Sequence, residues 1–221
     1  MQLTLEQLLS VVGPLDDAPG FDTARERFRR FISRHITDLA TTRQLIDQCL
    51  RLPGVQSHRA LADLVLCLGK FLDFEIVFGH YDRAPGSVSG TWRARRQLFV
   101  DVMVWTDQTP TLDVTQLADS LSAEEPSNDG ERRVGLGIVT PLFPSATRLG
   151  ELKDQRGRVP LYTLSLRLLL QLTEMAADRR VSQSFVVALL SRNPMLDELV
   201  EGIDLLLKKP AGKSASADDG N

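Results

Sequence analysis

The hydrophobic period of this chain changes once, close to Gly69, and that change constrains the fold more than any other feature. Up to Gly69, apolar side chains recur three or four positions apart, as in helices that bury one face. From Phe74 to Phe78 and from Gln97 to Trp105 the apolar residues recur at every second position, as in strands. We therefore expect an α/β protein in which a helical N-terminal region leads into a sheet.

Capping residues indicate where the N-terminal helices begin. Thr23 is followed three residues later by Glu26, which is the spacing of a capping box. We expect Arg25, Arg29 and Arg30 to lie largely on the solvent side of this helix, opposite the apolar face. Ser57 is expected to cap a later helix that ends at Gly69.

The segments that follow the central strand alternate between helix and strand. We expect a helix over 112–121, a polar loop over 124–130, a buried strand over 134–139, a short strand over 158–162, and helices over 165–175, 182–190 and 195–207. The two glycines of the 134–139 strand suggest that another part of the structure approaches its backbone closely. Four regions result: 1–70, helical; 71–178, an α/β core; 179–209, C-terminal helices; and 210–221, a disordered tail.

Composition excludes several classes of protein. The 221 residues include 26 Lys and Arg against 29 Asp and Glu, and a net charge of −3 argues against a dedicated nucleic-acid-binding domain. Cys49 and Cys67 lie on apolar helix faces, so we expect them to be reduced and buried. The three histidines have no metal-ligand spacing, and we expect no metal or other cofactor. Without a leader or a membrane-length apolar run, we expect a cytoplasmic protein with no membrane contact.

The order of the elements resembles the PD-(D/E)xK nuclease superfamily, which has the restriction-endonuclease-like fold. The stretches that carry the resemblance are 61–64, 74–81, 89–92, 100–117, 137–139, 155–158 and 164–172. The resemblance is greatest to a bacterial branch of that superfamily. It implies an α/β fold with a mixed sheet flanked by helices.

The residues that nuclease chemistry needs are missing from this resemblance. The superfamily uses an Asp on one strand and an Asp or Glu on the next, followed two residues later by Lys, to hold Mg²⁺ and position water. The resemblance places these residues at Ser89, Met103 and Trp105, and neither Met nor Trp supplies oxygen ligands for Mg²⁺. We therefore expect a pseudo-nuclease that is not an enzyme. A divergent Mg²⁺ nuclease that uses Glu75 and Asp101 instead is an alternative.

Basic clusters leave a second alternative, a DNA- or RNA-binding module that keeps the nuclease groove without cutting. Its candidate contacts are Arg93, Arg95, Arg96, Lys153, Arg156 and Arg158. The acidic charge balance disfavours this alternative, so nucleic acid is a possible partner but not the one we prefer.

The last predicted helix carries a broad apolar stripe. Its candidate partner-binding residues are Leu196, Leu199, Val200, Ile203 and Leu207. The stripe either packs on the preceding helices or docks on another chain. Met103 and Trp105 would also give the former catalytic groove an apolar concavity suited to a protein surface. We predict a structural or regulatory protein-interaction subunit of a bacterial assembly, with protein partners and self-association.

Overall fold

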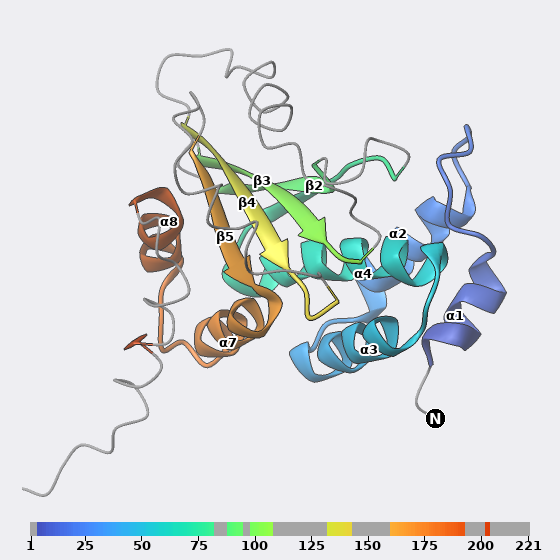
Figure 1. Cartoon of the computed structure of the whole chain (residues 1–221), viewed down its shortest axis with the longest axis horizontal. Helices are drawn as coiled ribbons and strands as arrows, with labels where there is room; N and C mark the ends of the chain where they lie inside the picture. Colours follow the sequence, from blue (N-terminus) through green and yellow to red (C-terminus); the bar gives the residue numbers. More distant parts are fainter. Residues whose placement is uncertain are drawn as a thin grey trace, which may run out of the picture.

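The computed structural model describes residues 4–81, 88–94, 98–107, 132–142, 160–192 and 202–203. Within these ranges the chain forms a five-stranded mixed sheet with helices packed against one of its faces (Figure 1). The α/β class and the restriction-endonuclease-like arrangement expected from the sequence are confirmed. The expected segments 112–121 and 124–130, most of 195–207, and the tail lie outside the described residues.

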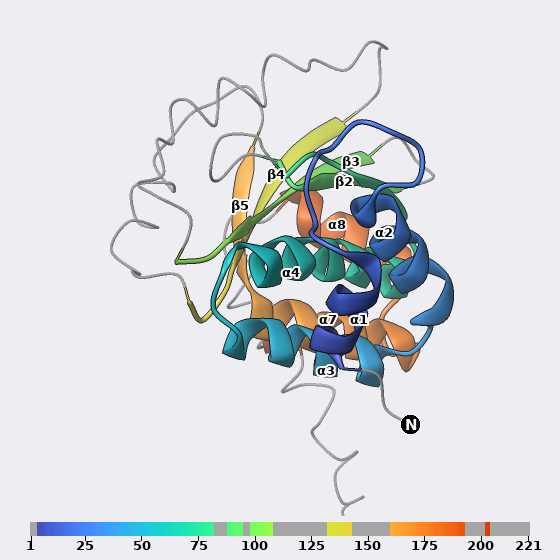
Figure 2. The same ribbon diagram turned by 90° about the vertical axis from the view of Figure 1, so that its right-hand side faces the viewer.

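The N-terminal helices are close to those that the sequence predicts. They are α1 (Leu5–Val12), α2 (Ala24–His35), α3 (Leu39–Arg51), α4 (Val55–Cys67) and the 3₁₀ helix η1 (Leu68–Leu72). The Thr23 hydroxyl accepts a hydrogen bond from the Glu26 backbone N–H at 3.2 Å, so this predicted cap is present. In both views α4 lies between the sheet and α3 (Figure 2).

The start of α4 differs from the prediction. The helix begins at Val55, after Gly54 at φ +115°, and Ser57 is buried inside the first turn rather than capping it. Gly54 lies in a region of backbone conformation that residues with a Cβ rarely adopt. The Pro53–Gly54 segment therefore brings the chain directly into the helix, three residues earlier than a serine cap at position 57 would allow.

The five strands lie side by side in the sheet in the same order as in the chain, and two helices follow the last strand. They are β1 (Glu75–Phe78), β2 (Gly90–Ala94), β3 (Leu98–Trp105), β4 (Arg132–Val139), β5 (Leu161–Ser165), α7 (Leu166–Ala177) and α8 (Gln183–Arg192). The pairs β1–β2 and β2–β3 are antiparallel, whereas β3–β4 and β4–β5 are parallel. One row across the sheet is Val77, Thr91, Asp101, Gly135 and Leu161.

Trp92 joins the sheet to the helices beneath it. Its side chain is fully buried, its Nε1 donates to the Leu66 carbonyl at 2.8 Å, and its ring stacks on Phe74. A Cβ at position 69 would lie 2.6 Å from the Trp92 ring. A residue without a side chain is therefore needed at position 69, inside η1, where the indole takes up the space.

Strand β3 is buried on both of its faces. Val100 and Val102 belong to the main hydrophobic core, and Asp101, Met103 and Trp105 on the opposite face are also fully buried. The expected apolar concavity at Met103 and Trp105 is therefore wrong, because neither side chain reaches the surface. The predicted close approach to β4 is confirmed, since the Trp105 ring packs directly on Gly137.

The two cysteines are buried free thiols, as the apolar faces around them indicate. Burial raises the pKa of Cys49 and of Cys67 to about 12. Both side chains are thus held as neutral, small hydrophobic groups at physiological pH.

The contact between Trp105 and Gly137 gives a stability prediction. A Cβ at position 137 would lie 2.3 Å from the Trp105 ring, so Gly137→Ala should lower the free energy of unfolding by about 1–3 kcal/mol. Gly202→Ala is the matched control, since nothing lies within 4 Å of its added Cβ, and it should leave stability unchanged or slightly raised. Urea unfolding of both variants measures the difference, and equal midpoints would contradict the packing described here.

Candidate functional site

The structure brings together two of the three positions at which the resemblance places nuclease chemistry. Ser89 immediately precedes β2, and its backbone N–H donates to the Val102 carbonyl at 2.8 Å. Its hydroxyl accepts from the Val104 N–H at 3.3 Å. Because Gly90 is opposite Val102 in the antiparallel ladder, Ser89 lies beside Met103, as a pair of metal-binding residues would.

The side chains at these positions do not fit a magnesium ion. Magnesium prefers oxygen ligands, and of the three residues only Ser89 has a side-chain oxygen. That oxygen already accepts a backbone hydrogen bond, while Met103 and Trp105 are enclosed in packing. Among the residues that the structure describes, no three His, Cys, Asp or Glu side chains gather closely enough to hold a metal ion.

Asp101, the first of the two fallback carboxylates, is held inside the sheet. Arg133 from β4 bonds both of its oxygens, with Nη2 to Oδ1 at 3.0 Å and Nε to Oδ2. The Thr91 hydroxyl of β2 donates to Oδ1 at 2.8 Å. These neighbours neutralise the buried carboxylate and satisfy it, as a buried charge requires.

Glu75, the second fallback carboxylate, lies elsewhere on the sheet. It is exposed at the start of β1, where it is opposite Arg93 on β2. Strand β2 separates it from Asp101, and the two residues stand in different rows. The structure therefore does not bring Glu75 and Asp101 together.

The other predicted site residues are only partly within the described ranges. Arg93 is exposed on β2, with its guanidinium 5.7 Å from the centre of the Phe99 ring. Ile203 is half-buried and packs against the hydrophobic core of its own chain. Residues Arg95, Arg96, Lys153, Arg156, Arg158, Leu196, Leu199, Val200 and Leu207 lie outside the described residues.

A buried polar cluster between α2, α4 and the end of β1 is the feature that the sequence analysis missed. Arg29 was expected on the solvent face of α2, but only 7% of it is exposed. Its Nε and Nη2 bond the two oxygens of Asp63 on α4, at 2.9 and 3.0 Å. Nη2 also donates to the Gly79 carbonyl at 2.9 Å, and the Tyr81 hydroxyl donates to Asp63. The cluster thus links three separate segments of chain.

Aromatic rings enclose the same cluster. The Arg29 guanidinium lies 4.8 Å from the ring centres of both Phe78 and Tyr81. Burial raises the pKa of the Asp63 carboxyl, whereas the neighbouring Arg29 charge acts to lower it. Burial, reinforced by Asp63, also raises the pKa of the Tyr81 phenol, which therefore stays protonated and donates. The apolar run Leu61–Leu66, interrupted only by Asp63, was the sequence signal that could have revealed this buried pair.

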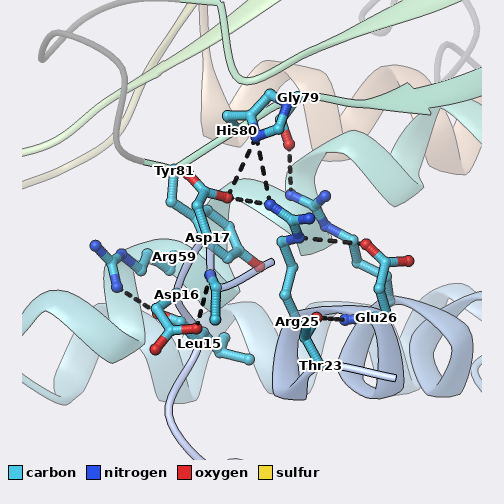
Figure 3. A network of polar contacts seen from close by, with 12 residues as sticks. Leu15, Asp16, Asp17, Thr23, Arg25, Glu26, Arg59, Gly79, His80 and Tyr81 are labelled. Carbon is cyan, nitrogen blue, oxygen red and sulfur yellow. Dashed lines mark hydrogen bonds and ion pairs between the residues drawn. The ribbon is translucent and has the colours of Figure 1, made fainter. Parts of the chain in front are cut away.

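Further polar contacts join the loop over residues 13–23 to the segments that form this cluster (Figure 3). Arg25 forms an ion pair with Asp17, and His80 Nδ1 lies 3.6 Å from the same carboxylate. Arg59 of α4 donates to the Leu15 carbonyl. Asp17 and Arg25 are both largely buried, so the loop is tied to α2, α4 and the segment after β1.

Comparisons with known proteins support the fold and nothing finer. No known protein family matches the sequence, and no curated protein matches it. Among solved structures, restriction endonuclease FokI superposes with a TM-score of 0.50 at 10% sequence identity. The superposition covers 75% of this chain and 32% of the FokI chain, so this protein spans about a third of FokI's length. Within the described residues, no helix is long and apolar enough to cross a membrane.

The buried ion pair gives a prediction about stability. Asp63→Asn leaves the Arg29 charge buried without a counter-charge and should lower the free energy of unfolding by about 3–5 kcal/mol. The double variant Arg29→Met with Asp63→Leu should lose less free energy of unfolding than Arg29→Met alone and Asp63→Leu alone lose together. The reason is that the double variant leaves no buried charge unpaired. Glu174→Gln, which breaks the half-exposed pair with Arg43, is the control and should cost under about 1 kcal/mol. Additive effects in urea unfolding would contradict the coupling.

Proposed function

We propose that this chain is a non-catalytic protein of the restriction-endonuclease-like fold that acts by binding another protein. The proposal is supported by Met103 and Trp105, which are fully buried and which, with Ser89, stand where the resemblance to the nuclease superfamily places the catalytic residues. A buried methionine and tryptophan can neither bind Mg²⁺ nor position an attacking water. The one carboxylate on this face of β3, Asp101, is already neutralised by Arg133.

The distribution of charge favours a protein partner over nucleic acid. The net charge is −3, and several arginines are paired with carboxylates of the chain itself: Arg25 with Asp17, Arg29 with Asp63, Arg43 with Glu174, and Arg133 with Asp101. Nucleic-acid binding depends on cations that can replace the counterions of the phosphates. Arginines held in internal pairs contribute little to that exchange. We therefore propose a structural or regulatory subunit of a bacterial assembly that self-associates.

The first test is a cleavage assay. Purified protein should show no Mg²⁺- or Mn²⁺-dependent cleavage of DNA or RNA, because its described residues hold no suitable pair of carboxylates. Cleavage that is lost in Asp101→Asn and kept in Asp47→Asn would refute the proposal and favour a divergent nuclease. Asp47 is an exposed residue of α3, so its substitution controls for preparation and folding.

The second test concerns nucleic-acid binding. The probes are labelled duplex and single-stranded nucleic acids at about 0.15 M salt. The dissociation constant should lie at about 1–100 μM, the range of non-specific binding, or be weaker still. Affinity should also fall as salt is added. Sub-micromolar binding that weakens in Arg93→Glu would instead support a nucleic-acid-binding module, since Arg93 is an exposed candidate contact. Light scattering on the same samples checks self-association, for which we expect a mass above that of one chain.

A further inference from the structure

Strand β1 is the first strand in the sheet order, and within the described residues no other strand pairs with its outer side. The Gly79 N–H donates to the Ser89 carbonyl at 2.8 Å, so Gly79 faces β2. Because hydrogen-bonding direction alternates along an antiparallel strand, the backbone groups of Ile76 and Phe78 point away from β2. No other described residue bonds to these outward N–H and C=O groups. The edge therefore offers donors and acceptors in the pattern that an added strand needs.

Helix α2 runs alongside this edge. From the middle of α2, Arg29 reaches the Gly79 carbonyl at the end of β1, and one turn later the Ser33 carbonyl accepts from Lys70, shortly before β1 begins. A pocket of about 330 Å³ lies between helix and strand. It is lined by Glu26, Arg29, Arg30, Ser33 and Phe78. Strand edge and helix thus form the two sides of one groove.

Arg29 supplies a fixed hydrogen-bond donor in this groove, while Asp63 already balances its charge. Its Nε and Nη2 are used by Asp63 and Gly79, whereas Nη1 has no hydrogen bond to any residue in the described part of the chain. Packing between aromatic rings holds the guanidinium in place. Half-exposed Arg30 lines the same pocket, and its contact with Asp22 is 3.4 Å long. The pocket's one carboxylate, Glu26, is already bonded to Arg25.

We propose that the groove between β1 and α2 binds an extended acidic peptide segment of a partner protein. The segment adds to the sheet at Ile76 and Phe78, and the side chain beside Phe78 points into the pocket because paired residues share a face. An Asp or Glu at that position meets Nη1 of Arg29 and the guanidinium of Arg30. This inference rests on the proposed protein-binding function and names the partner's chemistry.

A second copy of this chain fits the same edge poorly. Two β1 strands paired about a two-fold axis would lie about 5 Å apart. The residue beside Phe78 would then be Ile76 or Phe78 of the second copy, and neither supplies a carboxylate for the Arg30 guanidinium in the pocket. A single extended segment with an acidic residue avoids this mismatch.

A displayed library of random ten-residue peptides, selected on the whole protein, tests the proposal. We expect enriched peptides to carry an acidic residue among β-branched ones. Synthetic copies should bind Ile76→Pro at least tenfold more weakly, because proline removes the outward N–H while the bonds to β2 use Glu75 and Val77. Ile76→Val is the control for the side chain and should bind normally.

Charge reversal gives an independent arm. Arg30→Glu should weaken binding at least tenfold, whereas Arg51→Glu, at an exposed residue of α3, should not. Amide hydrogen exchange at Ile76 and Phe78 of the unaltered protein should slow when peptide is bound, which needs no variant to fold. The proposed binding groove would be refuted if no peptide is enriched. It would also be refuted if peptides bind but Arg30→Glu does not weaken the binding and amide exchange at Ile76 and Phe78 does not slow. Metal-dependent cleavage would refute the proposed function separately, whatever the peptides show.

Discussion

The buried pair of Arg29 and Asp63 is the contact on which the arrangement of the N-terminal half depends. It is the point where α2, α4 and the end of β1 meet, segments separated by up to fifty residues of chain. A buried arginine is tolerated only where its charge is matched and its donors are used, and Asp63, Gly79 and two aromatic rings provide this. The pair therefore fixes the position of α2 beside the sheet edge, and with it the groove along β1.

The central strand shows how packing and charge pairing fill both faces of one strand. Strand β3 keeps its place between an antiparallel and a parallel neighbour, as the fold requires. One face carries Met103 and Trp105, and Trp105 packs on Gly137. Asp101 lies on the same face, where Arg133 and Thr91 hold it as an internal structural group. Packing and charge pairing thus leave this face of the strand without the open, hydrated environment that metal chemistry needs.

Predictions from the sequence succeeded where they depended on local periodicity. The change of period at Gly69, the glycine approach at Gly137 and the cap at Thr23 were all found in the structure. They failed where a distant residue decides the outcome. The helical pattern places Arg29 with the other arginines of α2, and only Asp63, thirty-four residues away, explains its burial. The candidate site was located by order and spacing, but the burial of Met103 and Trp105 depends on neighbouring strands.

The sequence by itself determined the class of fold, because side-chain period is a local property, whereas the loss of the nuclease residues stays a prediction. The division into regions and the remaining basic and apolar candidates stay predictions. Only the tertiary structure decided which charges are internal, that Glu75 and Asp101 lie apart, and that no other described strand pairs with the side of β1 next to α2. Those outcomes depend on which segments meet in space. Periodicity shows which side chains share a face of a helix or strand, but it does not show which distant residue each polar side chain will contact.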